Sequence, residues 1–285
     1  MKVLVTGSTG FVGSHVAELF VRRGHVVVGV SRQVDDAQGV ATDLSRTDDV
    51  DALIQRVSPD ALVNLAAVPD IAPCKQDPEL AHALNTRLPG ALGHAAARLG
   101  ARLVHVSTDQ VFDGGRGGWR EDDAAAPRHL YGETKLAGER SVRVSCPAAV
   151  LLRPGLVTGQ APAGRRSSSS QLRQALQAAA RGGPRPGMFT DEYRTPVAAA
   201  DLARVIVESV ENPDLVGVYH VGGPDSISRH ELALAEARLQ GLDPTLIDES
   251  TRAAVGLVDE RPADLSLDSS KLVACLGWAP RALVA

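Results

Sequence analysis

Short, almost continuous apolar runs alternate along the chain with longer segments in which apolar side chains recur every three or four residues. The runs cover residues 3–5, 25–30, 61–66, 102–107, 148–152 and 216–221, and the periodic segments cover 48–57, 78–99, 129–143, 171–181, 200–212 and 228–240. Apolar runs predict strands buried on both faces, and the longer period predicts amphipathic helices. The repeated strand–helix order predicts an α/β fold of the Rossmann type, with a doubly wound parallel sheet.

The pattern changes after Arg153 and Pro154. Residues 160–170 are polar and contain glycine, proline and a serine run, and residues 182–187 form a second segment rich in glycine and proline. Such compositions predict loops. We therefore predict a dinucleotide-binding domain over residues 1–155. A smaller C-terminal α/β region over residues 156–285 is predicted to bind mainly substrate and can return elements to the first domain.

The first predicted strand runs into a glycine turn and a helix. Gly7, Gly10 and Gly13 follow the apolar run 3–5, and apolar side chains then recur with helical spacing. Glycines at such a turn permit backbone angles that a side chain blocks, a close approach to a diphosphate, and tight helix packing. The helix start adds unpaired N–H groups and a positive dipole end. This stretch predicts a dinucleotide site, although a glycine turn alone has a purely structural explanation.

The end of the second predicted strand bears on the choice of cofactor. A fold that selects NAD places an acidic residue there to bind the ribose 2′-hydroxyl, whereas an arginine suits a 2′-phosphate. Here Ser31 and Arg32 end the strand, and the first carboxylate is Asp35. We therefore predict NADPH as the preferred cofactor, with NADH as the alternative. A solvated loop position is the structural alternative for Arg32.

Tyr131 and Lys135 lie four residues apart on a predicted helix, so both face the same side. An ammonium near a phenol favours the phenolate, which would bring proton exchange by the tyrosine closer to neutral pH. Ser107 and Thr108 follow an apolar strand, at the edge where open parallel sheets bind ligands. A hydroxyl there could hold a substrate carbonyl while Tyr131 protonates it.

Composition narrows the class of partner. The 285 residues are 44% hydrophobic and 22% charged, with a formal net charge of −4, which gives no indication of a nucleic-acid surface. Three separated cysteines form no CxxC pair, and no apolar stretch reaches the length of a membrane helix. We expect a cytoplasmic protein with a small-molecule substrate, no membrane association and no catalytic metal. A homodimer is compatible with the sequence.

Motifs spread along almost the whole chain resemble those of extended short-chain dehydrogenases/reductases, and within them those of dTDP-4-dehydrorhamnose reductases. They are residues 6–13 (TGSTGFVG), Asp43-Leu44, residues 64–67 (NLAA), residues 107–114 (STDQVFDG), residues 131–139 (YGETKLAGE), Arg153-Pro154 and residues 261–271 (RPADLSLDSSK). The resemblance implies an NAD(P)-dependent oxidoreductase acting on a 4-keto-6-deoxy sugar nucleotide.

Site residues follow from the resemblance position by position. Thr108 would hold the keto oxygen, Tyr131 would be the general acid, and Lys135 would bind the nicotinamide ribose and tune Tyr131. The remaining cofactor-binding positions implied are Gly7, Thr9, Gly10, Phe11, Val12, Gly13, Ser31, Arg32, Asp43, Leu44, Ala66, Ala67, Ser107, Arg153 and Pro154. Asp43 and Leu44 would flank the adenine, and Ala66 and Ala67 would line the groove.

Substrate contacts are predicted at Thr108, Gln110, Arg194 and Arg261. An anionic diphosphate must be met by placed cations in a protein of net charge −4, and the arginine fork suits this task. Arg194 and Arg261 fall where nucleotide-sugar enzymes of this superfamily place such arginines. Surface ion pairing is the structural alternative for Arg194 and Arg261. Arg165 and Arg166 are weaker candidates, because a solvated loop explains them equally well.

The sequence departs from the reductase pattern beside the expected sugar site. Position 110 is usually tyrosine in these relatives and is Gln110 here, and residues 68–75 also diverge. The substrate therefore stays open between a sugar nucleotide and another carbonyl compound. A nucleotide-sugar epimerase and a cofactor-binding regulatory subunit without catalysis are the alternative functions.

Overall fold

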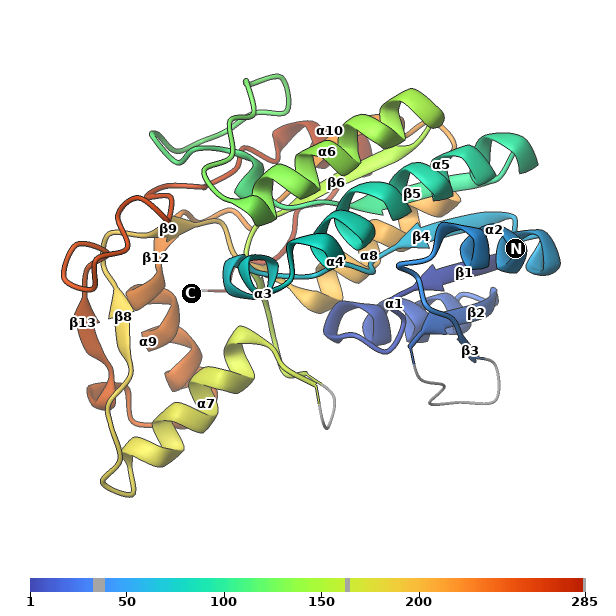
Figure 1. Ribbon diagram of the computed structural model, residues 1–285. Helices are drawn as coiled ribbons and strands as arrows, with labels where there is room; N and C mark the ends of the chain where they lie inside the picture. Colours follow the sequence, from blue (N-terminus) through green and yellow to red (C-terminus); the bar gives the residue numbers. More distant parts are fainter. Residues whose placement is uncertain (33–38, 162–164, 284–285) are drawn as a thin grey trace.

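The computed structural model describes residues 1–32, 39–161 and 165–283. Asp35 and part of the predicted loop 160–170 lie outside these described residues. Within them, the main sheet has seven strands, and every pairing between its neighbours is parallel (Figure 1). In spatial order the strands are β3 (Gly39–Ala41), β2 (Val26–Ser31), β1 (Lys2–Thr6), β4 (Ala61–Asn64), β5 (Arg102–Val106), β6 (Val150–Pro154) and β11 (Gly217–Val221).

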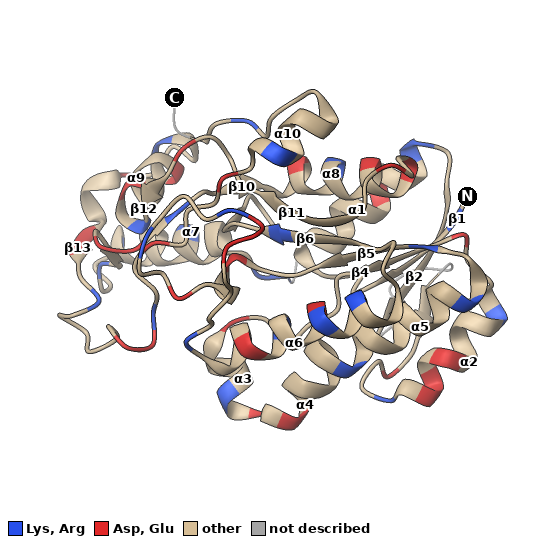
Figure 2. Ribbon diagram, turned by 90° about the horizontal axis from the view of Figure 1, so that it is seen from above, with Lys and Arg blue, Asp and Glu red and all other residues tan. Residues whose placement is uncertain are grey.

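Helices cover both faces of this sheet (Figure 2). One face carries α1 (Phe11–Arg22), α8 (Ala199–Glu211) and α10 (Ser270–Leu276), and the other carries α2 (Thr47–Val57), α5 (Leu88–Leu99) and α6 (Leu130–Ser145). Two buried apolar clusters fill the interfaces: Phe20 and Ile206 belong to the first, and Leu92 and Leu103 to the second. The predicted doubly wound α/β fold is confirmed.

The predicted helix over 78–99 is interrupted. It consists of α4 (Pro78–His82), a π-helical turn (Ala83–Arg87) and α5. Asn85 in the π turn is fully buried, where its amide pairs with both backbone groups of Val68 and reaches the Thr134 hydroxyl. These bonds join the segment after β4 to α6. Together with α3 (Ile71–Gln76), which the apolar pattern does not reveal, they shape one wall of the site.

A smaller group of elements lies to one side of the sheet (Figure 1). It contains α7 (Ser168–Ala179), β8 (Gly187–Phe189), α9 (Arg229–Leu239), a 3₁₀ turn (Pro244–Leu246) and β13 (Asp248–Ser250), which pairs with β8. Leu172, Leu176 and Ile247 form part of its own apolar core. The pairs β7 (Val157–Thr158) with β10 (Val197–Ala198) and β9 (Tyr193–Arg194) with β12 (Ile227–Ser228) connect it to the rest. The domain division at residue 155 remains a prediction, and α8, β11 and α10 from the later half lie on the main sheet.

Candidate active site

The three glycines of the first turn have distinct structural reasons. Gly7 has φ +67°, and a Cβ there would lie 3.0 Å from the Ala66 nitrogen. Gly10 precedes α1 as its N-terminal cap, and its N–H donates to the Gly7 carbonyl. A Cβ at Gly13 would collide with that same carbonyl. Side chains are thus excluded where the backbone and the start of α1 would meet a diphosphate.

The ends of β1 and β4 are joined beside this turn. The buried Thr6 hydroxyl donates to Asn64 Oδ1 over 2.6 Å and accepts from the backbone N–H groups of Leu65 and Ala66. Ala66 and Ala67 are both partly exposed next to Gly7. This arrangement fits the predicted groove for a dinucleotide, because small side chains here leave the strand ends accessible.

The residues predicted to lie near the adenine and its ribose differ in exposure: Arg32 is exposed and Leu44 is buried. Arg32 is exposed, and its charge acts on Asp43, whose pKa is lowered chiefly by hydrogen bonds from Ser45. Leu44 is only 6% exposed and belongs to the core. Ser31 is the last residue of β2 and Arg32 follows it directly, and the predicted contact of Arg32 with a 2′-phosphate remains a prediction.

The predicted catalytic side chains lie at the carboxyl edge of β5 and the start of α6. Thr108 is buried and lies within hydrogen-bonding reach of the Tyr131 phenol. The Lys135 ammonium, also buried, donates to the Val106 carbonyl over 2.7 Å. The structure therefore brings Thr108, Tyr131 and Lys135 to one edge, with Ser107 buried between β5 and Thr108.

The expected lowering of the Tyr131 pKa by Lys135 is not what the structure shows. Burial raises the pKa of Tyr131 above its ordinary value, and the hydrogen bond with Thr108 only partly opposes this. Burial also lowers the pKa of Lys135 to about 8, with Glu139 opposing the shift. Desolvation is the largest cause of both pKa shifts. Tyr131 is consequently a phenol that keeps its proton and can donate it.

Arg153 pairs with a carboxylate of α6. Its side chain is 2% exposed, and its Nε and Nη2 donate to the two oxygens of Glu139 over 2.9 and 2.7 Å. The guanidinium also lies over the Phe112 ring. The side chain therefore anchors α6 against β6, and a cofactor contact at Arg153 remains a prediction. Pro154, which follows it, ends β6 at the carboxyl edge.

Three arginines surround one buried carboxylate in the C-terminal half. Glu192 is 1% exposed; Arg261 binds it through two bonds of 2.6 and 2.8 Å, Arg194 Nη2 lies 3.1 Å away and Arg229 Nε 3.8 Å away. We call Glu192, Arg194, Arg229 and Arg261 the basic cluster. The sequence analysis named only Arg194 and Arg261, and the structure brings these two together. Arg165 and Arg166 are both exposed.

Asp109 links the basic cluster to the Thr108 hydroxyl. Its Oδ1 accepts a hydrogen bond from Thr108 over 3.1 Å, and its Oδ2 lies 3.6 Å from Arg194 Nε. Burial raises the pKa of Asp109 to about 6, although Arg194 opposes the shift. A continuous path of polar contacts thus runs from Thr108 through Asp109 and Arg194 to Glu192.

Two further residues at this edge escaped the sequence analysis. His129 caps the start of α6 and contacts Gln110, which was predicted to touch substrate. Asp70, the N-cap of α3, has a φ of +73°, and its charge acts on Tyr131, His129 and Arg261. Histidine is not one of the residues that favour an N-cap, so its position before Leu130 gave only a weak indication of the cap. No local pattern could have revealed Asp70.

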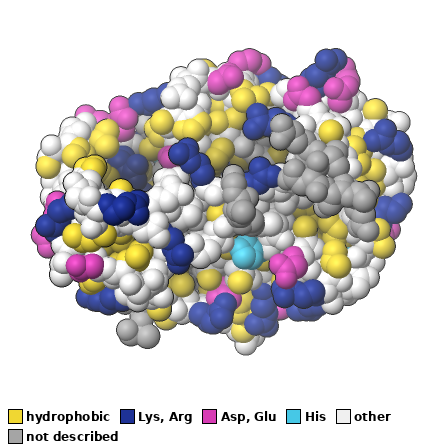
Figure 3. Space-filling model, turned by 90° about the horizontal axis from the view of Figure 1, so that it is seen from below, with side chains coloured by type: hydrophobic (Ala, Val, Ile, Leu, Met, Phe, Trp, Pro, Cys, Tyr) yellow, Lys and Arg dark blue, Asp and Glu magenta, His cyan; other side chains and the backbone are white. Residues whose placement is uncertain are grey.

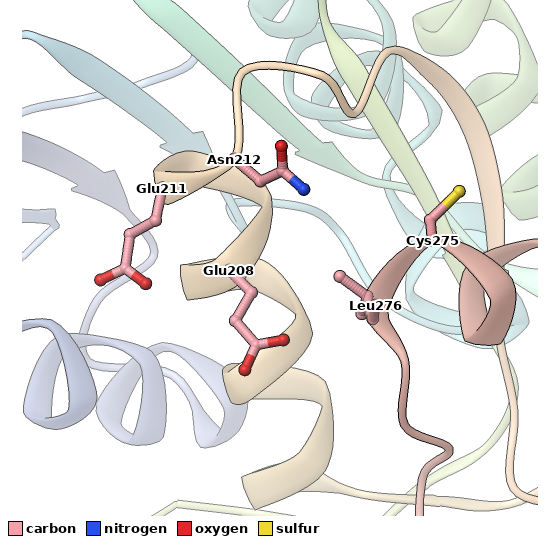
Figure 4. A pocket seen from close by; sticks show the side chains of 5 residues that line it. All are labelled: Glu208, Glu211, Asn212, Cys275 and Leu276. Carbon is pink, nitrogen blue, oxygen red and sulfur yellow. The ribbon is translucent and has the colours of Figure 1, made fainter.

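The surface of this part of the molecule carries scattered charge. Seen from below, basic side chains lie over both halves without merging into one continuous area (Figure 3). A separate cavity of about 230 Å³ lies between Glu208, Glu211, Asn212, Cys275 and Leu276. Its lining comes from the C-terminal ends of α8 and α10, away from the carboxyl ends of the strands (Figure 4). It includes none of the predicted site residues.

Within residues 1–32, 39–161 and 165–283, no three His, Cys, Asp or Glu side chains are grouped so that they could hold a metal ion. No helix in the same ranges is both long and apolar enough to cross a membrane.

Comparison with families of known proteins gives a match over nearly the whole chain. The model of a family described as RmlD substrate binding domain matches residues 1–283. The chain belongs to this family. As an RmlD-family member of the extended short-chain dehydrogenases/reductases, it is an NAD(P)-dependent oxidoreductase by class, and this confirms the predicted superfamily and enzyme class.

Individual relatives of this RmlD-family chain differ in their described roles. It is 31% identical over 284 residues to a probable low-salt glycan biosynthesis reductase, Agl14, of Haloferax volcanii, covering 97% of this chain and 93% of the relative. It is also 31% identical to the methionine adenosyltransferase 2 subunit beta of Xenopus laevis, covering 95% and 81%. A dTDP-4-dehydrorhamnose reductase structure from Clostridium acetobutylicum superposes with a TM-score of 0.87 at 25% identity, covering 99% and 95%.

Proposed function

We propose that this protein is an NADPH-dependent reductase of a 4-keto-6-deoxy sugar nucleotide. The observation that carries the proposal is the polar path from Thr108 through Asp109 to the basic cluster. It links a carbonyl-activating edge to a group of arginines suited to a diphosphate, which is the combination of groups that a keto sugar nucleotide requires.

The residues of the chain fit a nicotinamide dinucleotide. The turn at Gly7, Gly10 and Gly13 excludes side chains, the start of α1 offers N–H groups, and Arg32 is available for a 2′-phosphate. Ala66, Ala67 and Pro154 lie at the same edge of the sheet. When bound, the reduced nicotinamide supplies the hydride.

The chain's own residues would handle the carbonyl oxygen. Thr108 would hold it by turning its hydroxyl proton from Asp109 Oδ1 to the carbonyl oxygen, and Tyr131 would donate the proton, because burial keeps its phenol protonated. Lys135 is a buried cation on the same helix face, one turn beyond Tyr131, where it would bind the nicotinamide ribose. Arg194 and Arg261 would contact the diphosphate, with Arg229 as a third cation.

Oxidation of NADPH in the presence of a panel of keto sugar nucleotides tests this proposal. We expect turnover that depends on a 4-keto group and on the nucleoside diphosphate, with a Tyr131→Phe variant as the inactive control. Interconversion of sugar epimers without net oxidation of NADPH would instead identify an epimerase. Turnover of simple ketones at equal efficiency would exclude recognition of the diphosphate.

A regulatory subunit is the second candidate, favoured by the likeness to methionine adenosyltransferase 2 subunit beta. Such a subunit binds a nucleotide cofactor without needing Thr108 or Tyr131 as chemical groups. Thermal stabilisation by NADPH, together with an absence of turnover across the panel, would support this role. Co-purification with a partner enzyme whose activity then changes would establish it.

A further inference from the structure

The start of α6 is packed directly against the loop that carries Thr108. A Cβ at Gly132 would collide with the carbonyl oxygen of Gln110 and would lie 2.8 Å from Pro127 Cβ. Gly132 immediately follows Tyr131. The distance between the loop and the helix therefore sets the distance between the two groups expected to hold and protonate the carbonyl oxygen.

His129 and Gln110 connect the same two segments through their side chains. His129 Nδ1 accepts the N–H of Gly132 over 3.1 Å, so this nitrogen carries no proton. The ring proton must then lie on Nε2, which is 2.8 Å from Gln110 Oε1 and donates to it. Burial lowers the pKa of His129, which keeps the ring neutral. The capping bond thus dictates the tautomer, and the tautomer dictates the orientation of the Gln110 amide.

Each member of this pair is also tied to a catalytic side chain. The backbone N–H of Gln110 donates to Thr108 Oγ1 over 3.2 Å. The His129 ring lies nearly parallel to the Tyr131 ring, with 6.3 Å between centroids and 10° between planes. These contacts connect the Thr108 hydroxyl to the Tyr131 ring. They do not pass through the position expected for the substrate carbonyl.

We propose that His129 and Gln110 are positioning residues, a hydrogen-bonded latch that holds Tyr131 at its working distance from Thr108. This proposal rests on the proposed function only for the expected change in kcat. A capping role alone would need the Nδ1 bond but not the Nε2 bond.

Two variants separate the latch from the cap. His129→Asn retains a good N-cap residue but is too short to reach Gln110. Gln110→Leu removes the acceptor at similar volume. Each should lower kcat by about three- to tenfold, the effect of one hydrogen bond, while the NADPH affinity changes less than twofold. In His129→Asn, which alters no predicted substrate contact, the substrate KM should also change less than twofold. The double variant should be no slower than the slower single variant, since both remove the same contact.

Gln110→Glu provides the rescue, because a carboxylate oxygen can still accept the Nε2 proton. Its kcat should be within twofold of the wild-type value at pH 8. Multiplicative losses in the double variant, or unchanged kcat with only a lower melting temperature in the single variants, would overturn the latch.

A spectroscopic measurement decides the latch even if no keto sugar nucleotide is turned over. Imidazole ¹⁵N shifts should show the neutral Nε2–H tautomer of His129, and the Tyr131 Cζ resonance, assigned with Tyr131→Phe, should move in Gln110→Leu. An Nδ1–H tautomer, or an unmoved Tyr131 resonance, would refute the proposal. Failure of the whole substrate panel refutes the proposed function instead.

Discussion

The catalytic edge and the basic cluster are held in place by different forces. Lys135 is bound to a strand carbonyl, and its helix is anchored by the buried Glu139–Arg153 pair. Glu192, by contrast, is shared by three arginines, two of which have partly exposed side chains. Ion pairs of this kind can be exchanged for those of an incoming anion, whereas the anchoring of α6 cannot change without disturbing the core. The edge of Thr108, Tyr131 and Lys135 is therefore fixed by core contacts, whereas the basic cluster is held by ion pairs.

The largest effect is expected from Tyr131→Phe, which removes one hydroxyl at the edge fixed by core contacts. Turnover should fall by roughly 10²–10⁴, the usual contribution of a general acid, while NADPH affinity changes little. Steady-state kinetics and a cofactor titration measure both quantities. Tyr219→Phe, which removes a hydroxyl from β11 on the other side of the core, is the matched control. Turnover near the wild-type rate in Tyr131→Phe would refute the acid assignment.

Arg32→Ala probes a cation that belongs to neither of the two regions compared. If Arg32 pairs with the 2′-phosphate, NADPH should bind more weakly relative to NADH by roughly ten- to 150-fold, which corresponds to a charge-assisted hydrogen bond of about 1.5–3 kcal/mol. Dissociation constants for both cofactors provide the measurement. Arg22→Ala on α1, also an exposed arginine, is the control. Equal weakening of both cofactors would mean that Arg32 does not distinguish the phosphate.

Arg261→Ala tests whether the basic cluster receives the diphosphate. We expect the KM for a nucleotide sugar to rise about tenfold, in the lower part of the range for a charge-assisted bond because two arginines remain. NADPH affinity should stay nearly intact, and Arg238→Ala on α9 is the control. Arg194→Ala should raise KM too, but also lower the melting temperature, because it leaves Asp109 and Glu192 with less compensation. A bound nucleoside diphosphate out of reach of both arginines would contradict the clamp.

The smallest effect concerns Asp109, which joins the two regions. Burial raises its pKa to about 6 in the folded protein, against about 4 when unfolded. The folded state therefore binds more proton in this interval, so the contribution of Asp109 to stability is present below about pH 4 and is lost as the pH rises through 6. Asp109→Asn should raise the melting temperature at pH 7 by roughly 4–8 °C more than it does at pH 4.5, because a pKa difference of this size corresponds to about 2 kcal/mol between these pH values. An unchanged pH dependence would show that Arg194 compensates the charge fully.

The features that could be predicted from the sequence have local causes. The glycine turn follows from backbone sterics, and the Tyr131–Lys135 face follows from helical spacing. Glu192 and Arg229 could not be found this way, because the segments that carry them meet only through the tertiary fold. Arg153 was assigned to the cofactor by resemblance, and the same sequence gives no sign of its pairing with Glu139, 14 residues earlier on another element. The direction of the Tyr131 pKa shift was predicted wrongly, because helical spacing indicates a neighbouring charge but not the burial of the phenol away from water.

The spatial order of the strands has a consequence for the growing chain. Strand β6 ends at residue 154, but β11, which covers its free edge, begins at residue 217. At about 5–20 residues per second, a ribosome would need several seconds to supply it. During this interval an apolar edge stays unpaired and open to other nascent chains. We expect fragments ending before residue 216 to aggregate, which light scattering would detect, and full-length folding to benefit from a chaperone that shields this edge.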